Sequence, residues 1–346
     1  MKKVLFATSA LVLSAGFASA EVAVSGDGRM GVIYDGNDAQ FSSRARVKFT
    51  LTGESDSGLS FGGAFRVDQE NYRAAPAERS AAKGTAGAVW VSGTYGKLSM
   101  GDVVSASEAA IGDLYEVGYT EGEFGGDIEE ISYLTGDGAN INQGPNILYE
   151  YTVNNISFYA SASDGVNTSA PGVIGDSSYV SVDPVTGVVS TVDDGTDSAS
   201  TAYSLAAKYD AGNFWASLGY AKHDDESEIV LGGEGKFNNF SIKGVFAKYD
   251  DRFTLVTDAD SVLVGVNEFK HTIGLGLSYQ MDAILVKGFY RQDKWEDVAS
   301  GDTSKMDSFG IGADYDLGGG AVLAGGIIDS DYLDDTVVDM GVKFSF

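Results

Sequence analysis

Positively charged side chains recur at alternate positions in one stretch near the N-terminus. Arg44, Arg46 and Lys48 are spaced two residues apart, so on an extended strand they project from the same face. Neighbouring cations repel one another, and a fold tolerates such a row where counter-charge or water lies close by. Arg29 and Arg66 add two more cations to this region. The row predicts an electrostatic role, in which these cations face a region of opposite charge; a solvated strand face without a selective role is the alternative.

Counter-charge is concentrated in one segment, from Asp102 to Pro145, which contains no Lys or Arg. The acids that could face the cationic row are Glu108, Asp113, Glu116, Glu121 and Glu123. The segment is too long for an ordinary connection, and its many apolar and aromatic residues argue against disorder. We therefore predict an ordered acidic insert that packs against another part of the protein. A solvated external loop is the alternative.

Carboxylate oxygens could also bind calcium. The candidate ligands in the acidic segment are Asp127, Glu129, Glu130 and Asp137, and a second acidic run extends from Asp193 to Asp197. Neither run has the spacing of an EF-hand loop, so acidic surface exposed to the medium is the alternative. The sequence requires no cofactor, and calcium is the one bound ion that it suggests.

Other chemistry is largely excluded by composition. The chain has no cysteine and only two histidines, His223 and His271, which stand far apart in the sequence. A hydrolytic enzyme needs a convergent nucleophile and base, and the sequence shows no such arrangement, so we predict that the chain is not an enzyme. Gly26 to Gly31 fits G-x-G-x-x-G, but no helix follows it. The net charge of −27 argues against a nucleic-acid partner.

The first 20 residues predict a secretory signal peptide. Lys2 and Lys3 precede an apolar stretch, and Ala18-Ser19-Ala20 forms a small-x-small cleavage site. We therefore expect two parts, a signal peptide over 1–20 and a single domain over 21–346. The remaining chain contains no uninterrupted apolar run of the length that a transmembrane helix requires.

From Glu21 to Phe346 the dominant period of hydrophobicity is two, which is typical of β-strands. Ala45, Val47 and Phe49 share one face, opposite the cationic row. Three strands are expected within 21–68, and the later ones at about 86–94, 97–101, 146–152, 156–163, 202–209, 214–223, 229–237, 240–249, 269–279, 283–293, 307–315, 321–329 and 337–346. The total is sixteen, an even number.

The connections between these strands alternate between short and long. The short group is 53–58, 95–96, 153–155, 210–213, 238–239, 280–282 and 316–320. The other group is longer, with 224–228 as the exception, and 102–145 is its third member. Outer-membrane barrels have this asymmetry between tight periplasmic turns and longer external loops.

The alternation fits a barrel that faces lipid outside and water inside. The polar faces carry long cations that a narrow barrel could not hold, and aromatic residues gather near strand ends, as interfacial girdles require. An open sheet edge in lipid would leave backbone groups unpaired, which favours closure. We therefore predict an all-β fold, a 16-stranded antiparallel transmembrane β-barrel.

Several stretches resemble the general porins of photosynthetic and related alphaproteobacteria, the Rhodobacter type. They are the mature start EVAVSGDGRMGVIYDG, then FSSRARVKF, GDLYEVGYT followed by ISYLTGD, YDLGGGA and the closing GVKFSF. The resemblance spans essentially the whole mature chain. It implies a trimeric, water-filled outer-membrane barrel for passive diffusion of ions and small hydrophilic solutes. It also implies that the third external loop folds into the lumen and forms a constriction.

The resemblance assigns roles to individual residues. Arg29, Arg44, Arg46 and Arg66, with Lys48 continuing the row, match the family's basic wall, and the acids from Glu108 to Glu123 fall in its acidic loop. The segment EGEFGGDIEE departs from the family pattern. Phe346 is similar to the family's C-terminal assembly signal. The partners implied are two further copies of the chain, outer-membrane lipid and lipopolysaccharide.

Two other functions remain open from the sequence. A substrate-specific outer-membrane channel would use aromatic and polar groups to line a track. A surface or secreted acidic β-protein would use the same strands without forming a channel.

Overall fold

The computed structural model describes residues 21–71, 87–121, 127–134, 146–163, 178–182, 189–193, 201–257 and 263–346. In these ranges the chain is almost entirely strand, with a single α-helix, α1 (Ala106–Ile111). No helix in the described ranges is long and apolar enough to cross a membrane.

The strands follow one another along the whole described chain. Their bounds are β1 (Glu21–Tyr34), β2 (Ala39–Glu54), β3 (Ser60–Asn71), β4 (Gly87–Gly93), β5 (Gly96–Gly101), β6 (Asn146–Val153), β7 (Ile156–Ser163), β8 (Ser178–Val182), β9 (Val189–Asp193), β10 (Ala202–Asp210), β11 (Phe214–His223), β12 (Glu226–Phe237), β13 (Phe240–Asp250), β14 (Phe253–Thr257), β15 (Leu263–Met281), β16 (Ile284–Asp297), β17 (Thr303–Gly318), β18 (Ala321–Ser330) and β19 (Val337–Ser345).

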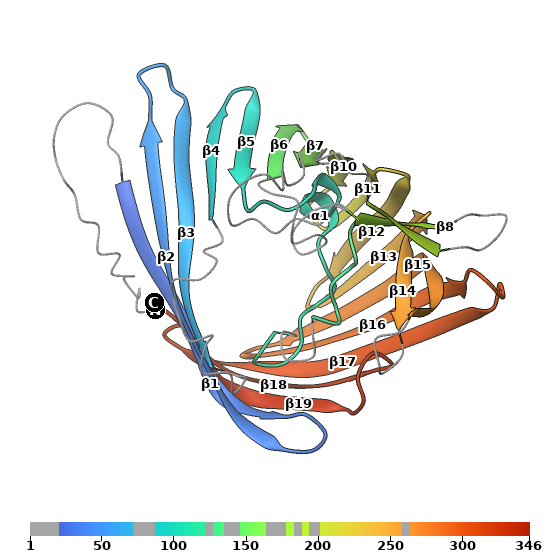
Figure 1. Cartoon of the computed structure of the whole chain (residues 1–346). Helices are drawn as coiled ribbons and strands as arrows, with labels where there is room; N and C mark the ends of the chain where they lie inside the picture. The colour runs from blue at the N-terminus through green and yellow to red at the C-terminus, as the bar shows by residue number, and fades with distance from the viewer. Residues whose placement is uncertain are drawn as a thin grey trace.

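Each barrel strand pairs antiparallel with its neighbours, and β1 also pairs with β19 to close the ring. β13 and β14 both pair with β15, so together they count as one interrupted strand. β8 and β9 form a separate hairpin. The prediction of a closed 16-stranded antiparallel barrel is therefore confirmed, and Figure 1 shows α1 and its flanking loop inside the ring of strands.

Most predicted connections agree with the structure to within a few residues, and four differ. The expected connection 164–201 contains the strands β8 and β9, and the expected connection 294–306 is shorter, because β16 ends at Asp297 and β17 begins at Thr303. The segment between β5 and β6 has the expected limits, since β5 ends at Gly101 and β6 begins at Asn146. The expected connection 224–228 is shorter, because β12 already begins at Glu226 and Asp224 takes a positive φ of 52° in a tight turn. The expected loop 250–268 contains β14 and the start of β15, which extend the hairpin beyond the barrel rim.

Side chains alternate between the outside and the lumen. On β13, Phe246 is 40% exposed on the outer face, while its neighbours Val245 and Ala247 are buried toward the inside. Exposed large apolar residues occur in the same way on the other barrel strands. This inverted pattern is the one that a membrane barrel shows.

The largest buried cluster lies between the inserted loop and the inner wall. Loop residues such as Leu114, Val117 and Ile131 pack there against wall residues such as Val245 and Phe289. Burial of apolar side chains is the main stabilising term in such contacts. The loop is therefore docked onto the wall, as its apolar content predicted.

Candidate pore constriction

The inserted loop starts with a short helix that is fastened to the wall. Ser105 caps α1 by accepting a hydrogen bond from the backbone N–H of Glu108 (3.2 Å). On the wall side, the Ser107 and Ser204 hydroxyls lie 2.8 Å apart, and the backbone N–H of Ala106 donates to Ser161 Oγ (2.9 Å). α1 contacts β7, β10, β11 and β12. Glu108 is therefore placed on a rigid support.

Lys243 on β13 holds the end of this helix. Its Nζ donates to the backbone oxygen of Ile111 (2.8 Å) and also to that of Asp113. The Asp113 carboxylate accepts from the backbone N–H of Ile131 (2.7 Å), which ties the outgoing arm of the loop to its returning arm. Burial raises the pKa of Asp113, while the charges of Lys243 and Arg291 act in the opposite direction. Asp113 thus has a positioning role within the loop.

Beyond α1 the loop follows a track of glycines on the inner face of the wall. A Cβ built on Gly232 would come 2.5 Å from Ile111 Cγ2, and one on Gly274 would come 3.0 Å from Leu114. The wall glycines that approach the loop in this way are Gly219, Gly232, Gly274, Gly276, Gly312, Gly326, Gly341 and Gly31, on β11, β12, β15, β17, β18, β19 and β1. Their lack of side chains allows the loop to lie flat against the wall.

The tip of the loop is bound to the closing strand. The Asp339 carboxylate on β19 accepts the backbone N–H groups of Tyr119 (3.1 Å) and Thr120 (2.9 Å), and the Thr120 hydroxyl as well. Arg29 donates to the backbone oxygen of Thr120 (2.7 Å). Tyr119 is fully buried against Gly341 and Gly31.

Three cations form a row across the seam of the barrel. In the strand register Arg29 lies opposite Lys343 on one side and opposite Arg44 on the other. Like charges in this arrangement destabilise a sheet unless counter-charge is supplied. Glu121 supplies it, because its carboxylate lies 3.2 Å from Lys343 Nζ and 3.6 Å from an Arg44 nitrogen. Glu121 therefore stabilises the cationic row, and the row fixes the position of this part of the loop.

The remaining wall cations differ in their partners. Arg46 and Arg66 both pair with Asp68 on β3, at 3.3 Å and 2.7 Å. Arg44 also lies 3.8 Å from Asp27. Lys48 is exposed to the lumen and has no ion-pair partner among the described residues. Acids on the wall itself thus offset much of the positive charge that the sequence predicted there.

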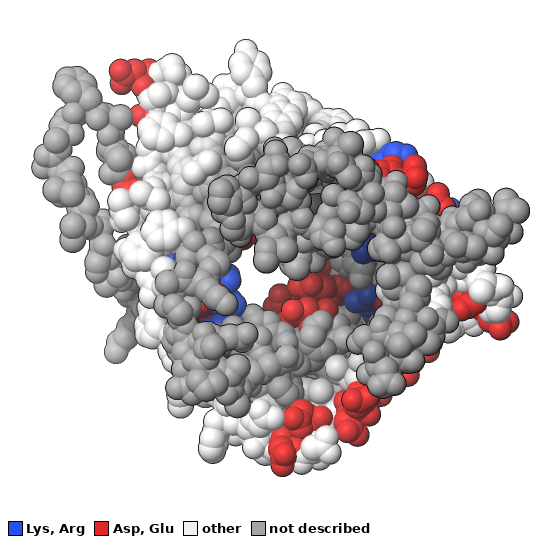
Figure 2. All heavy atoms as spheres, viewed as in Figure 1, with Lys and Arg blue, Asp and Glu red and all other residues white. Residues whose placement is uncertain are grey.

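Glu116 is an exposed acid of the loop. In the described part of the chain it has no ion-pair partner. Partial desolvation by the loop and wall raises the pKa of Glu116, as does the neighbouring charge of Glu121, while Lys287 and Lys343 act in the opposite direction. Figure 2 shows Lys and Arg atoms at the edge of the central opening nearest β2 and β3, and Asp and Glu atoms across it together with further Lys and Arg atoms.

The returning arm of the loop, 127–134, is clamped by charged residues of the wall. Arg291 on β16 donates to the backbone oxygens of Ile128 (3.0 Å) and Glu130 (2.5 Å), and to Ser132 Oγ (3.1 Å). Arg252 donates to the backbone oxygen of Ser132 (2.5 Å). The Glu228 carboxylate accepts from the backbone N–H of Leu134 (2.6 Å).

The candidate calcium ligands lie in or next to this arm. Glu129 is 1% exposed, and burial followed by the charges of Asp127, Glu116 and Glu130 raises its pKa to about 8. No group of three or more His, Cys, Asp or Glu in the described ranges is arranged to hold a metal ion. Asp137 lies outside these ranges, and so does Glu123 of the acidic rim. The calcium site stays a prediction.

Phe346 lies where the two ends of the chain meet. Its backbone N–H donates to the Gly26 oxygen (2.8 Å), and its ring, 81% exposed, packs edge-on to Phe344 with 5.4 Å between centroids. The terminal residue therefore completes the pairing of the last strand with the first.

Several residues of the site were not predicted as site residues. Those that hold the loop are Glu228, Lys243, Arg252, Arg291, Asp339 and Lys343, and those that pair with the wall arginines are Asp27 and Asp68. The sequence does contain one signal for two of them. Asp339, Gly341 and Lys343 alternate on the polar face of the last strand, as Arg44, Arg46 and Lys48 do on the second.

The stacked aromatic residues of the inner wall do not form an open track. Tyr249 and Phe269 stack with 4.5 Å between centroids, and Phe269 and Trp295 with 4.3 Å. Tyr249 is 0% and Phe269 2% exposed, because they belong to the cluster that the loop covers. The arrangement as a whole is a docked loop with charged groups facing water, which suits ion and solute passage.

Comparisons with known proteins agree with this architecture. The family profile described as Gram-negative porin matches residues 7–335. The chain is 37% identical to a porin of Rhodobacter capsulatus over 344 residues, covering 94% of this chain and all of that protein. It is 27% identical to a porin of Fuscovulum blasticum over 339 residues, again covering 94% and 100%.

Solved structures show the same barrel. A porin structure refined at 1.8 Å resolution matches with a TM-score of 0.68 and 33% identity, over 94% of this chain and all of that one. A mutant of the Rh. blastica porin matches with a TM-score of 0.61 at 21% identity and the same coverage, which shows the fold. The chain therefore belongs to the Gram-negative porin family, and it is an outer-membrane channel for ions and small solutes rather than an enzyme.

Proposed function

We propose that the channel sieves solutes at a constriction between the docked loop and the wall of β2 and β3, and that passage is passive. The observation that supports this is the course of the loop, which follows the inner wall from α1 to the cationic row, where Glu121 pairs with Arg44 and Lys343. A loop held at so many points narrows the lumen without closing it. The charges left facing the water then select among small ions and hydrophilic solutes.

We assign the main selective charges to Lys48 and Glu116. Arg44 is 5% exposed and paired with Glu121 and Asp27, while Arg46 and Arg66 share Asp68. A paired cation contributes less to the field in the pore than an exposed cation without a partner. Lys48 and Glu116 are both exposed and face the lumen from the wall and from the loop.

Replacing either residue by a neutral one tests this assignment. Lys48→Gln is expected to shift the permeability ratio toward cations, and Glu116→Gln is expected to shift it toward anions. Each change should be about fivefold, because a unit charge a few ångströms away in a partly hydrated site is worth on the order of 1 kcal/mol. The measurement is the reversal potential in a salt gradient, recorded on single channels.

The matched control is Lys222→Gln, the same substitution on the outer face of β11. It should leave the reversal potential unchanged. If the Lys48→Gln and Glu116→Gln channels conduct but have the wild-type reversal potential, the selective charges lie at other residues. A folded wild-type protein without stepwise currents would contradict the channel itself.

We further propose that the chain assembles as a homotrimer through its short strands. β4, β5, β6 and β7 have 7, 6, 8 and 8 residues, fewer than the roughly 9–11 that a strand needs to cross a bilayer. Their outer face is nevertheless apolar, with Val89 61% and Met100 48% exposed. A protein neighbour covers such a face better than lipid of full thickness does, and three copies are the number that the family resemblance implies.

Val89→Arg is expected to dissociate the trimer, because it places an unpaired charge in this interface. The control is Leu231→Arg, which puts the same charge on the outer face of the longer β12, where Leu231 is 49% exposed. Native mass spectrometry should show a monomer for the first variant and a trimer for the second. If both variants are trimers, or if both are monomers, the assigned interface is wrong.

We also propose that export removes residues 1–20, so that the protein starts at Glu21. An intact mass that begins at Glu21 checks the cleavage. The apolar outer face is then in contact with outer-membrane lipid and, on the external side, with lipopolysaccharide.

A further inference from the structure

The external connection between β18 and β19, residues 331–336, reaches the part of the wall that holds the inserted loop. Its Leu333 packs against the buried cluster that the inserted loop forms with the inner wall. Its Tyr332 donates a hydrogen bond from the hydroxyl to Asp293 Oδ2 on β16 (2.8 Å). The same hydroxyl accepts one from Trp295 Nε1 (3.0 Å). This connection is therefore fastened to the inside of the barrel.

The acceptor of the Tyr332 hydroxyl, Asp293, also orients the guanidinium group of Arg291. Arg291 Nε lies 3.1 Å from Asp293 Oδ1, and Arg291 Nη2 lies 2.6 Å from Oδ2. A two-point contact of this kind fixes the plane of the guanidinium group. Arg291 Nη1 then donates to the backbone oxygens of Ile128 and Glu130 in the returning arm. The position of Asp293 therefore sets the direction in which Arg291 holds the arm.

Two hydroxyl groups in turn hold the carboxylate of Asp293, which is 0% exposed. Thr272 Oγ1 donates to Oδ1 (2.6 Å) from β15, and Tyr332 donates to Oδ2 from the external connection. Hydrogen bonds to a buried charge are stronger than those between neutral groups, and their loss leaves the charge less well paired. Thr272 is fixed by a barrel strand, whereas Tyr332 is 41% exposed and belongs to a connection. The Tyr332 contact therefore depends on the position of the external connection.

We propose that Tyr332 is a positioning residue for the constriction, which couples the external connection 331–336 to the arm 127–134 through Asp293 and Arg291. With Tyr332 in place, Asp293 orients Arg291 and the arm stays docked. When the connection lifts away, Asp293 loses a partner and the hold on the arm weakens. Such coupling is reciprocal, so release of the arm also loosens the connection. This inference rests on the proposed constriction and adds a residue that controls it from the external side.

Tyr332→Phe tests the coupling, because it removes one hydroxyl and keeps the ring. Backbone hydrogen exchange of the full-length protein in detergent micelles, followed by mass spectrometry, measures the opening of both segments. We expect roughly tenfold faster exchange in 127–134 as well as in 331–336, because a hydrogen bond to a charged acceptor is lost. Arg291→Gln should also speed exchange in 331–336, as reciprocity requires. If Tyr332→Phe speeds exchange in 331–336 alone, or in neither segment, the coupling is wrong.

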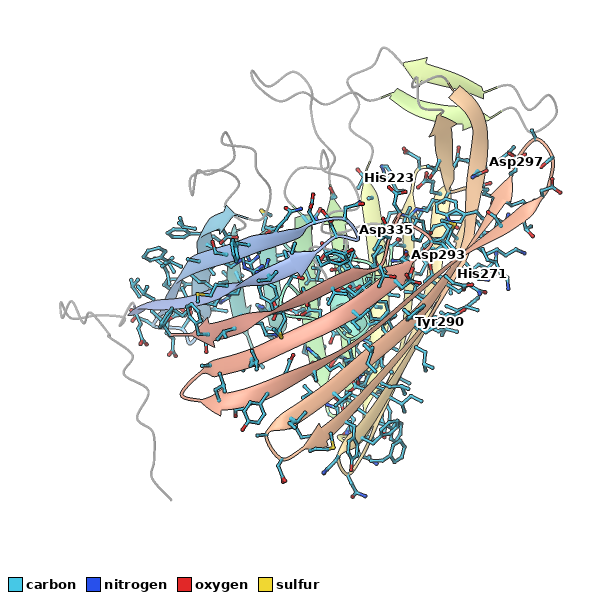
Figure 3. The ribbon with its side chains drawn as sticks, turned by 90° about the horizontal axis from the view of Figure 1, so that it is seen from below. His223, His271, Tyr290, Asp293, Asp297 and Asp335 are labelled. Atoms are coloured by element: carbon cyan, nitrogen blue, oxygen red, sulfur yellow. The ribbon has the colours of Figure 1, made fainter. Side chains whose placement is uncertain are left out.

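Tyr290→Phe is the matched control, because the Tyr290 hydroxyl also donates to an aspartate but lies on the outer face of β16. Its acceptor is Asp307 Oδ1 (2.7 Å). Figure 3 shows Asp293 closer than Tyr290 to the end of the barrel from which β14 and β15 extend. Tyr290→Phe should leave exchange in 127–134 at the wild-type rate. Equal acceleration by Tyr290→Phe and Tyr332→Phe would indicate general loosening of the barrel and would overturn the proposal.

The double variant Tyr332→Phe/Arg291→Gln tests the route of the coupling. Exchange in 127–134 should be no faster in the double variant than in Arg291→Gln, because the effect of Tyr332 passes through Arg291. If the two accelerations multiply, Tyr332 acts on the arm by another route and the proposal is wrong. Hydrogen exchange needs no current, so this result does not depend on whether the loop forms the constriction. The reversal potentials of Lys48→Gln and Glu116→Gln decide that question separately.

Discussion

Replacing Arg291 by glutamine is expected to release the returning arm of the loop and to turn a quiet channel into a fluctuating one. Arg291 is 7% exposed and donates to three acceptors in the arm, Ile128 O, Glu130 O and Ser132 Oγ. It also pairs with Asp293 (2.6 Å), which is 0% exposed. Glutamine is too short and too poor in donors to replace this set.

The loss should be large because it removes one partner of a buried charge pair. Such changes reduce stability by about 3–5 kcal/mol. Here the loss weakens docking of the arm and leaves the buried charge of Asp293 without its cation. Thr272 and Tyr332 still donate to Asp293, so the barrel strands keep part of that network. We therefore expect the barrel to form while the arm detaches part of the time.

Single-channel recording is the measurement, with limited proteolysis of the loop as the second readout. Arg291→Gln should show frequent conductance changes and faster cleavage in the arm, and Arg291→Lys should lie between it and wild type. Arg66→Gln is the matched control, because Arg66 pairs with Asp68 on the wall and lies on β3, away from the wall residues that bind the arm. An Arg291→Gln channel as quiet and as resistant as wild type would show that the clamp does not hold the arm.

The second large effect concerns Glu129 and pH. Burial raises its pKa to about 8, whereas an undocked glutamate titrates near 4.3, so the docked loop holds a proton that the undocked loop releases. Docking is therefore most favourable at acid pH and weakens as pH rises. The free energy of docking changes by about 1.4 kcal/mol per pH unit between the two pKa values. The total loss of docking free energy over this range is therefore at most a few kcal/mol.

Glu129→Gln is expected to remove this slope. At pH 5 the variant should resemble wild type, because both side chains are neutral, and at pH 8 to 9 its loop should be held more firmly. The frequency of conductance fluctuations between pH 5 and 9 measures this. Glu130→Gln, at the exposed neighbouring position, removes only a minor contribution to the raised pKa of Glu129, so most of the pH dependence should remain. Equal pH dependence in Glu129→Gln and wild type would refute the role of Glu129.

Much of the fold could be predicted because strand alternation is a local property. Ala45, Val47 and Phe49 alternate with Arg44, Arg46 and Lys48 whatever the strand pairs with. The sixteen strands and the limits of the acidic insert followed from such patterns and were confirmed. The departures lie in the connections, where local signals are weak. They are the turn after His223, the outward extension of β15, the hairpin of β8 and β9, and the short connection between β16 and β17.

The site could be predicted only in part, because its contacts join residues that are far apart in the chain. Arg291 meets a loop that is about 160 residues earlier, and Asp339 binds Thr120 across 219 positions. Nothing near Gly232 or Gly341 in the sequence shows that a loop side chain lies against it. Asp68 likewise offsets Arg46 because the register of β2 and β3 places them opposite each other.

By itself, then, the sequence determined the strands, their two faces, the acidic insert and the cationic row, because these depend on the order of residue types along the chain. The tertiary structure alone decided which of those charges remain free. Closure brings β19 beside β1, and there Glu121 engages Arg44 and Lys343, while Lys48 and Glu116 stay open to the lumen. The physical reason is that a charge selects ions by its local balance, and that balance is set by neighbours that only folding supplies.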